Sequence, residues 1–211
     1  MKLVKKYRNY VHVYETDLDL EGLKETSSLV KDFVTNYVDK DYPGINTGPE
    51  TTRYFNHYNL CLFVYPETQK LYDIINRVAN EHIQDWSEPW YLQCWLNWYN
   101  EGEYVDWHEH SKTTPIGWHG FVCVDTHESK TSYRFPKREI HTGESFDVES
   151  KDGHLVIGAS DGDQHRTYPW PYKDRPRITI AFDIVPRNVI NPYDYAPNHW
   201  MPLIQLGGNN E

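Results

Sequence analysis

Cysteine is scarce in this sequence: only Cys61, Cys94 and Cys123 occur among 211 residues. An odd number of widely separated cysteines cannot form a closed disulfide framework, and these show no paired spacing typical of a metal site. This usage predicts a reducing, cytoplasmic setting. Long apolar runs are missing as well, since none reaches the roughly 18 residues that a membrane span requires. No apolar segment with a cleavage site follows the basic start at 1–8, so we expect no secretion signal.

Basic residues are outnumbered by acidic ones, 21 against 31, which gives a formal net charge of −10 with histidine neutral. Partners rich in phosphate, such as nucleic acids and anionic membranes, attract clustered lysine and arginine. The charge balance therefore disfavours nucleic acid and membrane as partners. Internal repeats, low-complexity tracts and linker-like shifts in composition are also missing, so we expect residues 1–211 to form a single domain.

Aromatic residues are plentiful, at 15% of the chain, and they can bury enough surface for a folded core. Apolar residues recur every three or four positions near 19–39 and again over 67–85, where Pro66 stands at a tolerated first-turn position. These patterns predict two helices. They belong to an N-terminal helical buttress over about 17–85.

The β core is expected over about 88–186, where short segments alternate apolar and polar residues. The predicted strands are 90–99, 119–125, 131–135, 145–149, 154–158 and 177–185. Helices followed by many short strands predict a mainly β fold, a barrel or sandwich with helices packed on one side. Residues 187–211 show no period and are expected to form an irregular tail.

Two histidines stand two positions apart at the end of the segment 99–110. If that segment is extended, Asp106, His108 and His110 share one face, and two imidazoles so placed can bind one metal ion. A third neutral nitrogen donor can come from His165, which follows a later hydrophobic strand. The segment therefore predicts a metal site built mainly of histidine.

The order and spacing of several motifs resemble the iron(II)- and 2-oxoglutarate-dependent oxygenases, in particular the prolyl-hydroxylase-like branch. The motifs are Tyr99-x-x-Gly102, His108 six residues later, Gly153-x-Leu-Val-Ile157 before His165, and Arg177-x-Thr179. The resemblance covers roughly residues 90–185. It implies a double-stranded β-helix, of jelly-roll or cupin type, with the N-terminal helices packed on one sheet.

The resemblance also implies roles for individual residues. His108 and His165 would bind Fe(II), and Arg177 with Thr179 would hold the distal carboxylate of 2-oxoglutarate. A planar guanidinium suits this task because it can grip a carboxylate with two parallel hydrogen bonds. The implied reaction is that of a dioxygenase acting as a hydroxylase: O₂ is consumed, 2-oxoglutarate is decarboxylated to succinate, and a substrate is hydroxylated.

Asn97 and Tyr99 lie on the polar face of the 90–99 strand, from which they could donate further hydrogen bonds to the small-molecule co-substrate. The primary substrate is not readable from the sequence. The prolyl-hydroxylase resemblance favours a peptide or protein side chain, and a small metabolite is the other class, because a fold does not fix its substrate.

The sequence departs from the family pattern at position 110, where most members carry aspartate or glutamate and this chain carries His110. Three histidines leave the charge of the metal uncompensated but still permit a keto acid to bind through two atoms. We interpret His110 as the third ligand. Asp106 is its rival, since it would supply the missing charge from the same strand face. Glu109 points away from that face unless the strand bulges.

Two other functions fit the same residues. One is a cupin-type metal-binding protein with a different divalent-metal reaction, and the other is a non-catalytic jelly-roll binding module. The pair Arg177-x-Thr179 favours the oxygenase, because only that class needs a carboxylate clamp after the last ligand. The remaining histidines of this region are interpreted as surface or structural residues: His119, His127, His141 and His154.

Overall fold

The computed structural model describes residues 1–7, 10–37, 48–110, 117–135, 144–160, 163–187 and 202–208. The helical elements are α1 (Leu20–Tyr37), α2 (Glu50–Arg53), the short 3₁₀ turns η1 (Phe55–His57) and η2 (Leu60–Leu62), and α3 (Pro66–His82). The strands are β1 (Lys2–Tyr7), β2 (Val11–Glu15), β3 (Trp90–Tyr99), β4 (Trp118–Asp125), β5 (Lys130–Arg134), β6 (Ser145–Glu149), β7 (His154–Ala159), β8 (Gln164–Thr167), β9 (Arg177–Pro186) and β10 (Ile204–Gln205).

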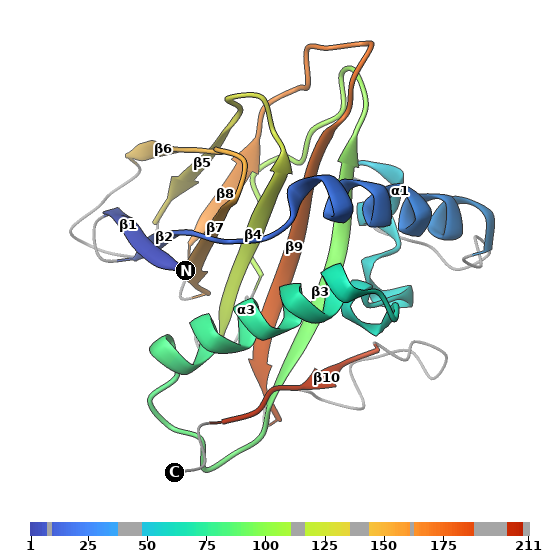
Figure 1. Cartoon of the computed structure of the whole chain (residues 1–211). Helices are drawn as coiled ribbons and strands as arrows, with labels where there is room; N and C mark the ends of the chain where they lie inside the picture. The colour runs from blue at the N-terminus through green and yellow to red at the C-terminus, as the bar shows by residue number, and fades with distance from the viewer. Residues whose placement is uncertain are drawn as a thin grey trace.

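These strands form a seven-stranded sheet, in the order β1-β2-β7-β4-β9-β3-β10, and a three-stranded sheet in the order β6-β5-β8 (Figure 1). Every strand pair is antiparallel. Strands that are neighbours in the larger sheet are mostly distant in sequence, as a jelly roll requires. The prediction of a mainly β, jelly-roll fold with flanking helices is confirmed.

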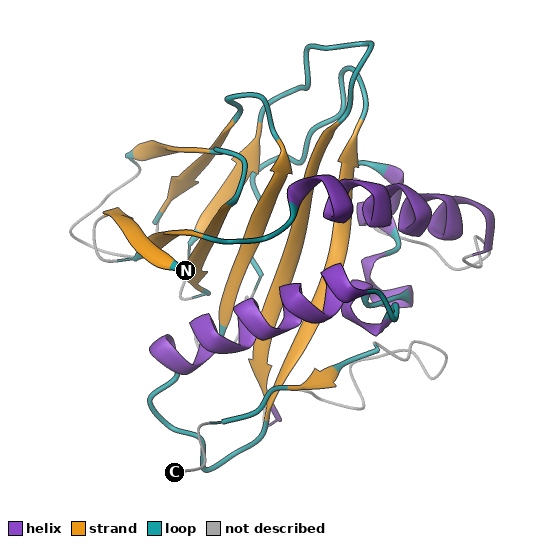
Figure 2. Cartoon of the chain, viewed as in Figure 1, coloured by secondary structure: helices purple, strands orange, loops and turns teal. Residues whose placement is uncertain are grey.

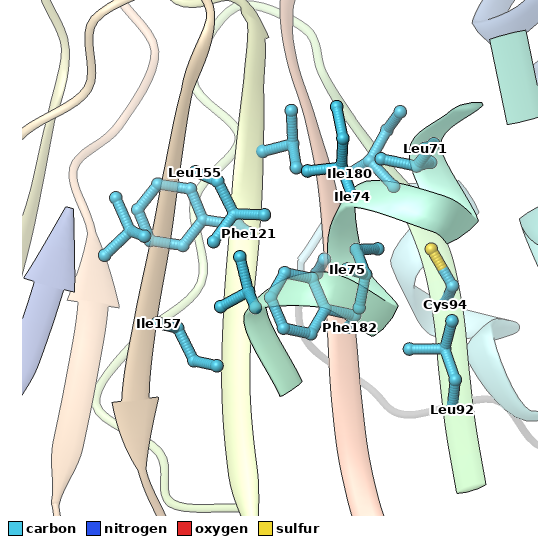
Figure 3. Close-up of a cluster of buried hydrophobic side chains, with 14 of the residues drawn as sticks. Leu71, Ile74, Ile75, Leu92, Cys94, Phe121, Leu155, Ile157, Ile180 and Phe182 are labelled. Atoms are coloured by element: carbon cyan, nitrogen blue, oxygen red, sulfur yellow. The ribbon is translucent and has the colours of Figure 1, made fainter. Parts of the chain in front are cut away.

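The two long helices lie on one face of the larger sheet (Figure 2). Each has the predicted apolar stripe, and α3 begins at Pro66, whose missing N–H costs nothing in a first helical turn. In Figure 3, Ile74 and Ile75 of α3 lie beside Ile180 and Phe182 of β9. All four side chains are essentially buried. Burial of this stripe holds the helices against the sheet.

Strand β9 divides its side chains between the two faces of the larger sheet, as its alternating sequence predicts. Its isoleucines and Phe182 are fully buried in the core beneath the helices. The alternate residues face a cavity on the opposite side: Arg177, Thr179, Ala181 and Asp183. The helices therefore cover one face of the sheet and leave the other to the functional site.

Four strands were not predicted from sequence: β1, β2, β8 and β10. Strand β2 has only five residues, too few for its alternation of buried and half-buried side chains to be distinctive. Strand β1 is an exposed edge strand, so no buried face imposes an alternation on its residues. Strand β8 has only four residues, mostly polar. Strand β10 is a two-residue pairing within the segment expected to be an irregular tail, and residues 188–201 and 209–211 of that segment lie outside the described residues.

Within the part of the chain that the structure describes, no helix has both the length and the apolar character needed to cross a bilayer. The three cysteines are free thiols, and two of them, Cys94 and Cys123, are buried.

Candidate metal centre and co-substrate pocket

A cavity of about 340 Å³ lies on the face of the larger sheet opposite the two long helices, α1 and α3. Strands β3, β4 and β9 of the larger sheet and β5 and β8 of the smaller one contribute lining side chains, together with the segment 105–110. The two sheets of a jelly roll thus enclose the site between them, which is where such folds usually bind small molecules.

Three of the predicted residues meet at this cavity: His108, His110 and His165. Their closest available ligand atoms all lie within 4.8 Å of one another. The Nε2 atoms of His110 and His165 are 3.3 Å apart. Metal–nitrogen bonds of about 2.0–2.1 Å place neighbouring ligands at roughly this separation. The spacing therefore suits two ligands of one ion.

Backbone pairing fixes two of these histidines relative to each other. The N–H of His108 donates to the carbonyl of His165 at 3.1 Å, and the N–H of His165 donates back at 3.0 Å. This single antiparallel bridge is the only regular pairing recorded for the segment 106–110. The expected extended strand is thus reduced to one bridge, but that bridge brings residues far apart in sequence to the same point.

The second ring nitrogen of each histidine faces an oxygen atom. The Nδ1 of His108 lies 2.8 Å from the backbone oxygen of Asp106, and the Nδ1 of His110 lies 2.6 Å from a carboxylate oxygen of Asp183. The Nδ1 of His165 is 3.6 Å from a carboxylate oxygen of Asp163. With Nδ1 directed to an acceptor, Nε2 is the atom left to bind a metal.

Asp106 does not face the cavity. Its side chain is exposed, and its carboxylate accepts a hydrogen bond from the backbone N–H of Trp107 at 2.8 Å. Glu109, expected to point away, is instead among the lining residues. Both expectations relied on strict alternation along an extended strand. That alternation fails because the chain bends at Trp107 and pairs only through His108.

Burial shifts the pKa values of the three histidines. Burial, assisted by the neighbouring His110, lowers the pKa of His108 to about 4. Burial and the nearby His108 hold the pKa of His165 well below its usual range. Burial also acts to lower the pKa of His110, but the carboxylate of Asp183 outweighs it, so that pKa is raised. His108 and His165 are therefore neutral at physiological pH, the form that binds metals.

His119 is a site residue that the sequence analysis missed. It was expected to be a surface or structural residue, but it is only 1% exposed and lines the cavity. Its Nε2 lies 2.6 Å from a carboxylate oxygen of Asp163, and its ring stacks on that of His165 with centroids 4.6 Å apart. Its position at the start of β4, two residues before the inward-facing Phe121, was the available signal.

Arg177 lies at the other end of the cavity, with only 3% of its surface exposed. Its Nε donates to the hydroxyl of Ser129 at 2.7 Å, and Nη2 is 3.5 Å from the hydroxyl of Ser150. Its Nη1 is buried without a hydrogen-bond partner. Burying a charged group beside neutral hydroxyls alone is costly, so the guanidinium is suited to an anionic ligand.

Thr179 and Asn97 form a buried chain of hydrogen bonds beside this guanidinium. The hydroxyl of Thr52, on α2, donates to the side-chain oxygen of Asn97 at 2.7 Å. The amide nitrogen of Asn97 is 3.4 Å from the hydroxyl oxygen of Thr179, the residue directly opposite on β9. The predicted residues Asn97 and Thr179 are therefore brought together with Arg177, and Asn97 contacts protein groups through both ends of its amide.

Comparison with known proteins follows from this geometry. No protein-family model matches the chain, and no curated protein matches it. Solved structures do match. A prolyl-4-hydroxylase from Pseudomonas putida aligns with 84% of this chain and 92% of its own, with a TM-score of 0.53 and 13% sequence identity. The fold is that of the 2-oxoglutarate–iron(II) oxygenases.

Two further solved structures have the same fold as this chain. AviO1 from Streptomyces viridochromogenes Tue57 covers 83% of this chain and 89% of its own, with a TM-score of 0.59 and 13% identity. SnoK, a non-heme alpha ketoglutarate dependent carbocyclase from nogalamycin biosynthesis, covers 85% and 81%, with a TM-score of 0.54 and 10% identity. At such identities the likeness concerns the fold, and function has to be argued from the site.

Proposed function

We propose that this protein is a non-haem Fe(II)- and 2-oxoglutarate-dependent oxygenase that hydroxylates its substrate. The observation that carries the proposal is the presence, in one cavity, of three imidazoles with converging nitrogens and a buried guanidinium with an unpaired Nη1. A metal site alone would fit many activities. A metal site beside a buried guanidinium that can bind a carboxylate fits a 2-oxoglutarate-dependent oxygenase.

His108, His110 and His165 would hold the iron through Nε2. Imidazole nitrogen suits Fe(II), and three ligands on one side leave positions open for a keto acid and O₂. The bound metal would supply the redox chemistry that couples oxidation of 2-oxoglutarate to hydroxylation of the substrate. The exposed carboxylate of Asp106 has no place in this arrangement, so His110 is the third ligand we propose.

Arg177 would bind the distal carboxylate of 2-oxoglutarate through Nη1, with Thr179 beside it. Tyr99, which lines the cavity directly opposite Arg177, would donate a further hydrogen bond from its hydroxyl. Burial raises the pKa of this phenol, although the neighbouring Arg177 opposes that shift. Asn97 acts through Thr179, whose hydroxyl it positions. The co-substrate would thus extend from the guanidinium to the three histidines.

The substrate would enter beside the aromatic part of the cavity, which Phe55, Trp95 and Phe121 line. These rings exclude water from the histidines and offer an apolar surface. The proposed substrate is a peptide or protein side chain, by analogy with the neighbour named a prolyl-4-hydroxylase, with a small molecule as the second class. The cytoplasmic setting remains a prediction from cysteine usage.

The test combines a binding and a turnover measurement. Anaerobic addition of Fe(II) and then 2-oxoglutarate is expected to produce a visible absorption band that neither gives alone, and admission of O₂ is expected to release succinate. Iron binding with no response to 2-oxoglutarate would favour the cupin-type metal protein. Absence of iron binding would favour the non-catalytic module. Either result contradicts the proposal.

A further inference from the structure

Two aspartates lie against the histidines of this site: Asp183, which lines the cavity, and Asp163, which is buried. Asp183 contacts Nδ1 of His110 at 2.6 Å, and its side chain is 21% exposed. Asp163 is 2% exposed and reaches two imidazoles, those of His119 at 2.6 Å and His165 at 3.6 Å. Neither residue was singled out by its sequence context.

Strand register holds Asp183 in place. It lies between Gln93 of β3 and His119 of β4, its direct neighbours in the larger sheet. An aspartate on an interior strand of a packed sheet is costly unless a partner compensates its charge. The His110 ring is that partner. Because β9 is paired on both sides, the backbone of Asp183 is fixed beside the cavity, and its carboxylate can leave the imidazole only by changing rotamer.

Asp163 sits in a stack of imidazoles. The rings of His119 and His165 are nearly parallel, at 6°, and the ring of His110 stacks on both, with centroids 4.7 Å from His119 and 5.0 Å from His165. The carboxylate of Asp163 is hydrogen-bonded to His119 and faces Nδ1 of His165 at 3.6 Å, beyond hydrogen-bond distance, so its charge favours the orientation in which Nε2 of His165 points toward His110. The second carboxylate thereby orients a second proposed ligand.

We propose that Asp183 and Asp163 are positioning residues that supply, through the histidine rings, the negative charge that position 110 lacks. A carboxylate bonded to Nδ1 fixes the tautomer of an imidazole and makes its Nε2 a stronger donor to a metal. The charge therefore acts on the ion without occupying a coordination position. This inference deepens the proposed function and depends on it for the identity of the metal.

The rival explanation is a purely structural one, in which the aspartates serve only to satisfy buried histidines. The two explanations differ in what a neutral replacement changes. Asparagine keeps the size of the side chain and an oxygen acceptor but removes the charge. A structural role would alter folding stability alone, whereas a role toward the metal would alter its affinity and its reduction potential.

The experiment uses the full chain with Asp183→Asn and Asp163→Asn, and Asp17→Asn as a control. Asp17 is an exposed carboxylate paired with Lys70, away from the cavity, so its variant loses the same charge without touching the site. Two quantities are measured: Co(II) affinity, from the visible spectrum of the bound ion, and the Fe(III)/Fe(II) midpoint potential.

We expect each site variant to bind Co(II) roughly 10- to 100-fold more weakly than the native protein, with the control unchanged. The Fe(III)/Fe(II) midpoint potential should become more positive in both site variants, since loss of negative charge destabilises Fe(III) more than Fe(II). Unchanged affinity and potential in variants that remain folded by circular dichroism would overturn the inference. So would a changed Co(II) coordination spectrum in Asp183→Asn, because that would make Asp183 a ligand.

Failure of the proposed function is distinguishable from failure of this inference. Co(II) binding requires only the histidines, so the comparison among variants can be made even if the native protein releases no succinate from 2-oxoglutarate. Should a variant fail to fold, Asp183→Glu provides a second measurement: it retains the charge at a greater length, and we expect it to recover part of the metal affinity and potential.

Discussion

Tyr99 and Arg177 stand directly opposite each other on β3 and β9, and the Arg177 guanidinium carbon lies 4.8 Å from the centroid of the Tyr99 ring. The aromatic face stabilises the cation and covers one side of it. Hydroxyls of Ser129 and Ser150 contact other parts of the same group. The guanidinium is therefore held in one orientation before any ligand arrives.

Replacing Arg177 should separate co-substrate binding from metal binding. In Arg177→Ala we expect the 2-oxoglutarate concentration for half-maximal succinate release to rise roughly 100-fold or more, since charge-assisted hydrogen bonds are lost. Metal affinity should stay within about twofold, because the contacts of Arg177 within the described residues are with Ser129, Ser150 and Tyr99 rather than with the proposed ligands. Arg177→Lys serves as the control. It keeps the positive charge but cannot make two parallel hydrogen bonds, so its half-maximal 2-oxoglutarate concentration should rise less than that of Arg177→Ala. Unchanged turnover in Arg177→Ala would remove the basis for the co-substrate assignment.

The third ligand can be tested by comparing two neighbouring positions. His110→Ala should weaken Fe(II) binding by roughly 100-fold or more, because it removes a metal–nitrogen bond and leaves Asp183 without its partner. Asp106→Asn should bind iron like the native protein, since its carboxylate is exposed and bonded to the backbone of Trp107. Anaerobic titration measures both. Weakened iron binding in Asp106→Asn, with native binding in His110→Ala, would instead make Asp106 the third ligand.

Gly120 is required by close packing within the larger sheet. A Cβ atom at this position would lie 2.2 Å from the carbonyl oxygen of Val156 and 2.5 Å from the ring of Phe182. We expect Gly120→Ala to lower the free energy of unfolding by about 2–3 kcal/mol. Gly158→Ala is the matched control, because its nearest contacts would be at 3.4–3.5 Å, and it should change stability by less than about 1 kcal/mol. Urea unfolding measures the free energy of unfolding of both variants. Equal losses in the two would contradict the prediction that close packing requires Gly120.

His82 makes stability depend on pH at the opposite face of the sheet. Burial, together with the neighbouring His12 and Lys6, lowers its pKa from 6.5 to about 4. Between these values the unfolded chain binds a proton that the folded chain does not, so stability falls as pH decreases from about 6.5 to 4. Allowing for partial exposure, the loss should be about 1–2 kcal/mol.

The control for this pH effect is His82→Gln, whose amide oxygen can still accept a hydrogen bond from the hydroxyl of Tyr14, now 3.0 Å from Nε2 of His82. Urea unfolding at pH 7 and pH 4.5 should show a smaller loss of stability in the variant than in the native chain. Parallel losses would mean that other groups cause the dependence.

Sequence reasoning succeeded where the pattern was local. The alternation in β9 predicted which side chains share a face, and the structure turns the face of Arg177 and Thr179 toward the cavity. His108 and His110 were visible because they are two residues apart. Strand β1 was missed because an exposed edge strand has no buried face to impose alternation, and β8 because four mostly polar residues carry no hydrophobic signal.

The parts of the site that escaped prediction depend on contacts between distant segments. Asp163 and Asp183 meet their histidine partners only when β4, β8 and β9 assemble. The residues next to them in sequence give no signal of these contacts. His119 was missed because β4 is buried along most of its length, so the inward side chains do not differ in polarity from the outward ones. The bend at Trp107 likewise breaks the alternation from which Asp106 was expected to face the site and Glu109 to point away from it.

Strand β1 borders the larger sheet with a sequence rich in lysine, Lys2, Lys5 and Lys6 within six residues, and its side chains point largely to solvent. An open sheet border offers unpaired peptide groups to any other extended chain, and positive charge there repels a second copy of itself. At the opposite border, β10 pairs with only two residues of β3, too short a template for further growth. Both edges of the larger sheet therefore disfavour pairing with a strand of another molecule, the step by which sheets aggregate.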